Sequence, residues 1–83
     1  MEPSKILIID DERHICKACR MALSKRGHTV DTCMTGKAGL ETTLDGKYDV
    51  VLLDMKLPDI DGMDVLKKIG SGDTIVRITI EEK

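Results

Sequence analysis

The 83-residue sequence predicts a single α/β domain with a parallel sheet, and three observations support this prediction. Two stretches are continuous apolar runs, ILII at residues 6–9 and VVLL at residues 50–53. Continuous runs of branched apolar residues are typical of strands covered on both faces, as in a parallel sheet. Segments with helical character separate the strand candidates, and the resulting order β-α-β-α-β-α-β fits right-handed crossovers between parallel strands.

Each element has its own signal in the sequence. In chain order, strands and helices are expected to alternate at residues 5–9, 13–26, 28–33, 37–44, 49–53, 62–69 and 74–80. The first helix should stop at Gly27, because glycine is common just after a helix C-terminus. Gly39 should weaken the second helix by roughly 1 kcal/mol relative to alanine. In the third helix, Met63, Leu66 and Ile69 are expected to face inward. Arg77 interrupts the last strand, which indicates an edge position in the sheet rather than a central one.

Composition limits the classes of function. The net charge is −2 and Tyr48 is the only aromatic residue, so the chain lacks the basic, aromatic surface typical of nucleic-acid binding. Its apolar runs are too short to cross a membrane, and the polar first residues do not resemble a signal peptide. We therefore expect no nucleic acid, no membrane contact, a cytoplasmic location and an aliphatic core.

The three cysteines and two histidines are expected to have no redox or metal-binding role. Cys16 and Cys19 form a CxxC motif, but a redox motif is favoured at a helix N-terminus, and no second cysteine or histidine pair completes a zinc site. Packing is the preferred interpretation because Cys19 belongs to an apolar stripe with core-facing helical spacing, namely Ile15, Ala18, Cys19, Ala22 and Leu23. We expect reduced thiols. His14 and His28 have no partners at metal spacing and are expected at the surface.

Three aspartates follow the two apolar runs. Asp10 and Asp11 come directly after the first run, and Asp54 comes directly after the second. Parallel strands end at the same edge of a sheet, so these carboxylates should meet where open α/β sheets bind ligands. Two like charges about 4 Å apart repel by roughly 4 kcal/mol at an effective dielectric of 20, and Mg²⁺ suits such a set of hard oxygen ligands. The alternative is that Asp11 and Glu12 only cap the first helix, but capping does not explain Asp54.

The amino-acid sequence around these acids resembles that of a known family. ILIIDDE, VVLLDMKLPDIDG and the intervening GHTVDTCMTGKAGL are similar to the receiver domain of two-component response regulators, over about residues 4–70. Within that family, the sequence looks most like the receivers of nitrogen-regulator-type transcription activators. The resemblance implies a flavodoxin-like three-layer αβα fold with a parallel sheet in the order 2-1-3-4.

The resemblance also implies a role for each site residue. Asp54 would accept a phosphoryl group from a sensor histidine kinase. Asp11 and Asp54 would bind Mg²⁺ (or Mn²⁺) directly, Asp10 mostly through water, and the backbone carbonyl of Lys56 would be a further ligand. Receivers assist their own phosphorylation and dephosphorylation, but they act as signalling modules in phosphorelays.

The chain departs from the family pattern after residue 70. We interpret residues 1–83 as one receiver shortened at its C-terminus, lacking the last helix, strand and helix, with 70–83 of uncertain origin. The active-site lysine expected before a proline is missing. Thr79 is the best match for the Ser or Thr that closes the fourth strand, although Ile80 replaces the usual small residue. The strand at 74–80 would present an open edge, which predicts self-association by edge pairing or by exchange of the C-terminal segment.

Two alternatives to a phosphoacceptor remain open at this point. One is an inactive receiver-like fragment that acts as a self-associating structural module. The other is a hydrolase of the haloacid-dehalogenase type, but its Asp-x-Asp motif is not present in DDE at residues 10–12. The PDIDG segment at 58–62 hints at a calcium loop, but Leu57 and Lys68 stand where acids would be required.

Overall fold

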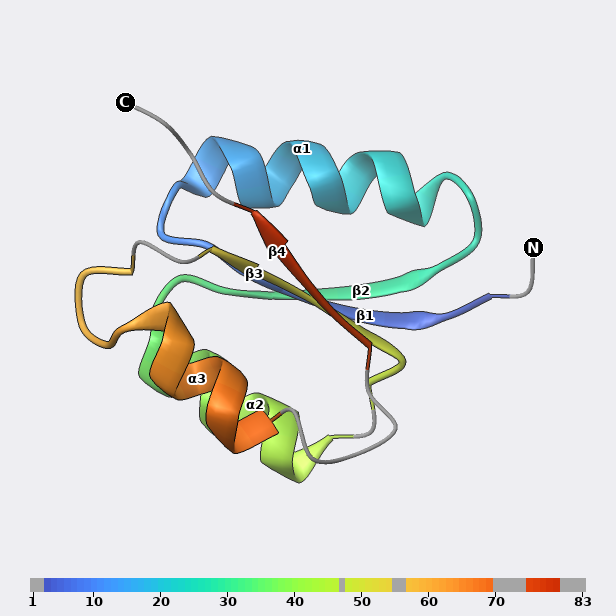
Figure 1. The fold of residues 1–83 in the computed structure, drawn as a ribbon. Helices are drawn as coiled ribbons and strands as arrows, with labels where there is room; N and C mark the ends of the chain where they lie inside the picture. Colours follow the sequence, from blue (N-terminus) through green and yellow to red (C-terminus); the bar gives the residue numbers. More distant parts are fainter. Residues whose placement is uncertain (1–2, 47, 55–56, 70–74, 80–83) are drawn as a thin grey trace.

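The chain forms a four-stranded parallel sheet with helices on both faces. The computed structural model describes residues 3–46, 48–54, 57–69 and, as a strand, 75–79. Its elements in chain order are β1 (Lys5–Ile9), α1 (Arg13–Ser24), β2 (Thr29–Cys33), α2 (Gly36–Asp45), β3 (Val50–Asp54), α3 (Gly62–Ile69) and β4 (Ile75–Thr79). Helix α1 covers one face of the sheet, and α2 and α3 cover the other (Figure 1). The predicted three-layer fold is confirmed.

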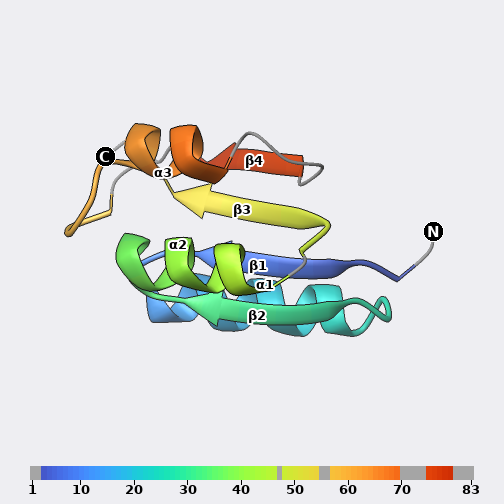
Figure 2. The same cartoon turned by 90° about the horizontal axis from the view of Figure 1, so that it is seen from below.

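The strand order is β2-β1-β3-β4, as expected (Figure 2). All three pairings are parallel, and the register aligns Ile9 with Cys33 and with Leu53. Strand β4 lies at the edge of the sheet next to β3, which confirms the edge position predicted for the last strand. Within the described ranges, no helix is long and apolar enough to cross a membrane.

The apolar run of β1 is continuous because both of its sides are buried. Ile6 and Ile8 pack with Cys16 of α1 and Val30 of β2. Leu7 and Ile9, both 0% exposed, pack on the other face of the sheet against residues from β3, α3 and the segment before β3. Alternate side chains point to opposite faces of a strand, so an apolar residue is needed at every position.

Two residues are more buried than the sequence indicated. Tyr48 is 7% exposed and belongs to the core on the α2 and α3 face, so the core is not purely aliphatic. Its hydroxyl donates a hydrogen bond to Asp31 Oδ2 at 2.7 Å, which satisfies the polar end of the ring. His28 was expected at the surface but is also buried, and its Nδ1 accepts a hydrogen bond from Ser4 N at 3.0 Å. His14 is exposed, as expected.

The buried faces of α1 and α3 differ in part from the expected ones. In α1, Cys16 is the buried residue, with Cys19 and Leu23 packed beside it, whereas Ala18 and Ala22 are exposed. The buried set therefore begins one residue later than the expected stripe. In α3, the residues facing the core are Gly62, Val65 and Ile69, and Met63, expected to point inward, is 46% exposed.

Two glycines have clear structural reasons. Gly27 has φ of +89°, a backbone conformation that favours glycine, and it ends the turn after α1. The helix itself ends at Ser24, two residues before the predicted Arg26. Gly39 lies inside α2, where a Cβ atom would be only 2.5 Å from Ile9 Cδ1. The glycine that weakens α2 intrinsically is therefore what allows that helix to approach β1 closely.

Candidate functional site

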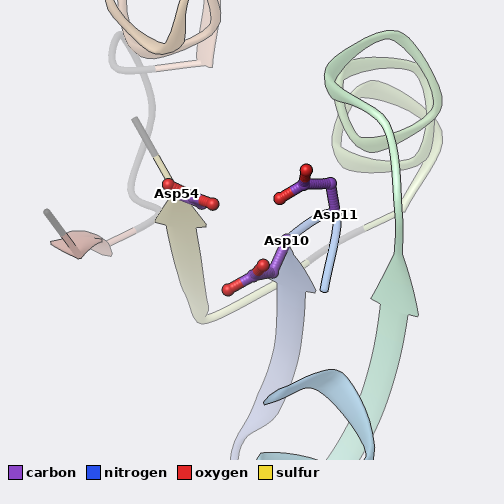
Figure 3. A group of neighbouring side chains, drawn as sticks. All are labelled: Asp10, Asp11 and Asp54. Atoms are coloured by element: carbon purple, nitrogen blue, oxygen red, sulfur yellow. The ribbon is translucent and has the colours of Figure 1, made fainter. Parts of the chain in front are cut away.

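Three carboxylates meet at the carboxyl edge of the sheet. The register of β1 and β3 pairs Ile9 with Leu53, so the residues that follow, Asp10 and Asp54, emerge side by side. Asp11 is in the loop that leads to α1. One carboxylate oxygen from each of the three residues lies within 4.8 Å of the others (Figure 3). The predicted convergence of these acids is thus present.

Hydrogen bonds to neighbouring segments fix Asp10 in place. Its Oδ1 accepts from Glu12 N at 2.9 Å, and its backbone N donates to the carbonyl of Cys33 at 3.0 Å. Its own carbonyl accepts from Cys16 Sγ at 3.2 Å. The buried thiol therefore helps to position the first acid of the site.

The three acids differ in exposure. Asp10 is 5% exposed and Asp54 is 4% exposed, while Asp11 is exposed to solvent. Burial raises the pKa of Asp10 above its ordinary value, and the charges of Asp54 and Asp11 raise it further, against the opposing effect of the Glu12 hydrogen bond. A divalent cation at this place would favour the charged form of the carboxylates and offset their repulsion.

The capping alternative is not supported by the contacts at the start of α1. Glu12 occupies the N-cap position of the helix, but its side chain makes no capping hydrogen bond. Its backbone N–H instead contacts the Asp10 side chain. The acids after β1 are thus arranged toward one another and toward Asp54.

The other two predicted site residues have different outcomes. Lys56, expected to provide a backbone carbonyl, lies outside the described residues. Thr79 ends β4, and the register places it opposite Asp54 at the same edge of the sheet. The backbone position of Thr79 is therefore suitable for the assigned role, which stays a prediction.

The cysteines support the packing interpretation. All three are free thiols. Cys16 is buried in the core beneath α1, and burial raises its pKa, which is the opposite of what a reactive thiolate requires. In the part of the chain that the structure describes, the aspartate trio is the only group of three or more residues arranged to hold a metal.

A contact between the β3–α3 loop and α2 was not predicted. Asp59 Oδ1 accepts from Gly36 N at 2.9 Å, and Oδ2 accepts from Lys37 N at 3.0 Å. These bonds, first that from Lys37, hold the pKa of Asp59 below its ordinary value. Thr35 Oγ1 accepts from Ala38 N at 3.1 Å, so the start of α2 is capped twice. Of these two caps, only Thr35 could have been recognised from sequence, because threonine directly before a helix is a common N-cap. Asp59 is 23 residues away from Gly36 along the chain.

Comparison with known proteins agrees with this geometry. The family model for the response regulator receiver domain matches residues 6–82. Response regulator ArlR of Staphylococcus saprophyticus is 36% identical over 80 residues, covering 96% of this chain and 36% of ArlR. The chain thus spans about a third of that longer protein.

Solved structures support the same assignment. A CheY-like receiver domain from Methanospirillum hungatei superposes with a TM-score of 0.92 at 25% identity, covering 99% of this chain and 67% of that one. The response regulator TrrA from Thermotoga maritima, solved in complex with Mg²⁺ and BeF, superposes with a TM-score of 0.79 at 32% identity, covering 89% of this chain and 64% of TrrA. With the matching fold, the aspartate trio and the family match over most of its length, the chain belongs to the response regulator receiver domain family.

Proposed function

We propose that this chain is a phosphoacceptor in a two-component phosphorelay and that Asp54 receives the phosphoryl group. The observation that carries the proposal is the meeting of Asp10, Asp11 and Asp54 within 4.8 Å at the carboxyl edge of the sheet. Asp54 ends β3, a central strand that pairs with β1 on one side and β4 on the other, so its carboxylate has a rigid support. A rigidly held nucleophile reduces the entropy that must be lost on the way to the transition state.

The same trio fits a divalent cation. Asp11 and Asp54 would bind Mg²⁺ (or Mn²⁺) directly, Asp10 would act mostly through water, and the carbonyl of Lys56 would complete the protein ligands. Bound Mg²⁺ would supply positive charge that neutralises the phosphoryl oxygens. The complex of the relative TrrA with Mg²⁺ and BeF supports this assignment.

The transfer itself needs one bond to form and one to break. An oxygen of the Asp54 carboxylate attacks the phosphorus of a phosphohistidine on the sensor kinase. As the new O–P bond forms, the P–N bond breaks and its electron pair stays on the histidine nitrogen. Asp10 and Asp11 would orient the site, and Thr79, whose backbone pairs opposite Asp54 in the register of β3 and β4, would contact the transferred group.

The partner would dock beside the acids, in the cytoplasm. Helix α1 begins three residues after Asp10, and exposed Arg13, Lys17 and Arg20 line a pocket together with Met34. Basic side chains next to an acidic centre would steer an anionic, phosphorylated partner toward the site. This face of α1 is the expected contact surface for the sensor histidine kinase.

Labelling with a small phosphodonor tests the proposal. Acetyl phosphate with Mg²⁺ should add one phosphoryl group to the wild-type chain, detected by intact mass, and chelation of the metal should prevent it. Asp54→Asn should abolish labelling. Asp64→Asn, which changes an exposed acid in the first turn of α3, is the matched control and should label like the wild type. Undiminished labelling of Asp54→Asn would refute the assignment.

A second candidate function is favoured by the edge position of β4. An inactive, self-associating module would use this edge, or exchange of the C-terminal segment, to join copies of the chain. Mg²⁺ binding without any labelling of Asp54 would support the module over the phosphoacceptor.

A further inference from the structure

The loop that follows Asp54 is attached to a helix that contributes no acid to the site. Five residues after Asp54, the Asp59 carboxylate spans the first two N–H groups of α2. Those N–H groups have no partner within the helix and lie at the positive end of its dipole. A charged acceptor therefore binds there more strongly than a neutral one.

Apolar contacts reinforce the same attachment. Gly36 is buried, and a Cβ atom at this position would overlap the Ile60 side chain and lie 3.1 Å from Leu57 Cδ1. The loop residues on both sides of Asp59 thus pack directly on the backbone of α2. Leu57 and Ile60 also contact the core cluster on this face of the sheet.

These contacts link the segments that follow β1, β2 and β3 to one another. Asp10 is bonded through its N–H to the carbonyl of Cys33, at the end of β2. Three residues later the chain reaches Gly36, which is bonded to Asp59, and the loop then leads back to Asp54. The ends of β1 and β3 are therefore connected by backbone pairing on one side and by Asp59 on the other.

We propose that Asp59 is a positioning residue that fastens the β3–α3 loop to α2 and so holds it in place beside the acidic site. The inference rests on the proposed function, because the loop begins directly after Asp54, one of the proposed ligands of the cation. A ligand that is held in place before binding loses less conformational entropy when the cation binds, and the affinity is higher for that reason. Asp59 would thereby raise the affinity for Mg²⁺ without touching the metal.

Simple helix capping is the competing explanation, and the chain contains a control for it. Thr35 caps the same helix end through Ala38 N but has no hydrogen bond to the described part of the loop, residues 57–61. Thr35→Ala therefore removes a cap and leaves the attachment of the loop. Asp59→Ala removes both a cap and the attachment.

Calorimetric Mg²⁺ titrations of the wild type, Asp59→Ala and Thr35→Ala test the difference. Asp59→Ala should weaken Mg²⁺ binding about tenfold, since residues that orient a metal site from outside often contribute that much. Thr35→Ala should leave the affinity essentially unchanged. Equal losses in both variants, or no loss in Asp59→Ala, would overturn the inference. If Asp59→Ala proves too unstable to study, Asp59→Asn, which removes the charge and keeps one acceptor, replaces it.

Amide hydrogen exchange of the metal-free protein gives a readout that does not depend on the metal. Met63 N is bonded to Asp61 Oδ1 at 3.0 Å, where the loop leads into the first turn of α3. Its exchange should accelerate in Asp59→Ala and not in Thr35→Ala. A wild type that binds no Mg²⁺ would refute the proposed function, but the exchange comparison would still decide the inference: unchanged Met63 exchange in Asp59→Ala would refute it.

Discussion

Asp10 is a buried carboxylate whose close charged neighbours include two further carboxylates. Burial and like charge raise its pKa, so the folded protein retains this proton to a higher pH than the unfolded chain does. The stabilising contribution of Asp10 is complete below the unfolded value of 3.8 and is lost as the pH rises through the folded pKa. At neutral pH the charged residue is therefore destabilising unless a cation is bound.

Asp10→Asn should stabilise the metal-free protein at neutral pH by on the order of 1 kcal/mol, because it removes a charge from the trio. The amide oxygen can still accept the hydrogen bond from Glu12 N, so the local contact survives. Urea unfolding with and without excess Mg²⁺ measures both effects, and the stabilisation by Mg²⁺ should shrink in the variant. Glu41→Gln, at an exposed position of α2, is a charge-matched control. A metal-free Asp10→Asn less stable than the wild type would contradict this account.

Tyr48 gives a second prediction at the scale of one residue. Burial first, and then the hydrogen bond and charge of Asp31, raise the pKa of Tyr48 to about 12. Its contribution to stability is present below the unfolded value of 10.0 and is lost as the pH rises toward 12. Tyr48 is the only tyrosine, so tyrosinate absorbance reports this residue alone.

Replacing Asp31, which accepts the hydrogen bond, separates its effect on the pKa of Tyr48 from the effect of burial. Asp31→Asn should lower the pKa of Tyr48 toward 10 but leave it above that value, because the ring stays buried. Tyr48→Phe should lose about 1 kcal/mol of stability at neutral pH, the typical contribution of one hydrogen bond. Wild-type absorbance that titrates at 10 would show that the hydroxyl is not held as described.

At the scale of elements, the contact between α2 and β1 depends on Gly39. Alanine would raise the helix propensity of α2 by about 1 kcal/mol, but overpacking in a core typically costs about 1–3 kcal/mol. The new Cβ would lie 2.5 Å from Ile9 Cδ1, so we expect Gly39→Ala to be destabilising overall. Urea unfolding of Gly39→Ala, Ile9→Ala and the double variant should show that the two costs are less than additive. A more stable Gly39→Ala would mean that α2 can move away freely.

The elements themselves could be predicted from sequence, but their buried faces could be predicted only in part. In α1, the expected stripe and the observed set share Cys19 and Leu23, and hydropathy alone does not choose between the overlapping stripes. The positions of β1 and β2 beneath the helix decide in favour of Cys16. In α3, Val65 and Ile69 are spaced to face the core together, which leaves Met63 on the outer side.

For the site, too, the sequence predicted some features and missed others. Asp10, Asp11 and Asp54 were predictable because parallel strands end at one edge, so sequence position alone determines that they meet. Asp59 and Tyr48 were not, because each acts through a contact with a distant segment, α2 or β2. Such contacts depend on how loops are placed, which periodicity does not encode.

At the scale of the whole molecule, the edge of β4 leads us to expect association between copies. Sedimentation velocity over a rising concentration series should show dimers or larger species at high micromolar concentration, in the presence of a reductant to exclude disulfides between the three free thiols. Edge pairing should reverse quickly on dilution, whereas exchanged segments should separate slowly because they must unfold. A monomer at every concentration would count against both routes.

Because β1 is apolar on both sides, hydrophobicity alone does not determine its register in the sheet. Because both faces are buried, a shift by one residue would still bury apolar side chains on each face, so hydrophobicity selects the register only weakly. Specific contacts at the strand ends also act on the register. Among them, Asp49 Oδ2 accepts from Lys5 N at 2.8 Å where the strand starts, and Ile9 fits against Gly39 where it ends. A glycine in a helix therefore acts as a stop that determines where Asp10 emerges from the sheet. A substitution there could misalign the acids without altering any of them.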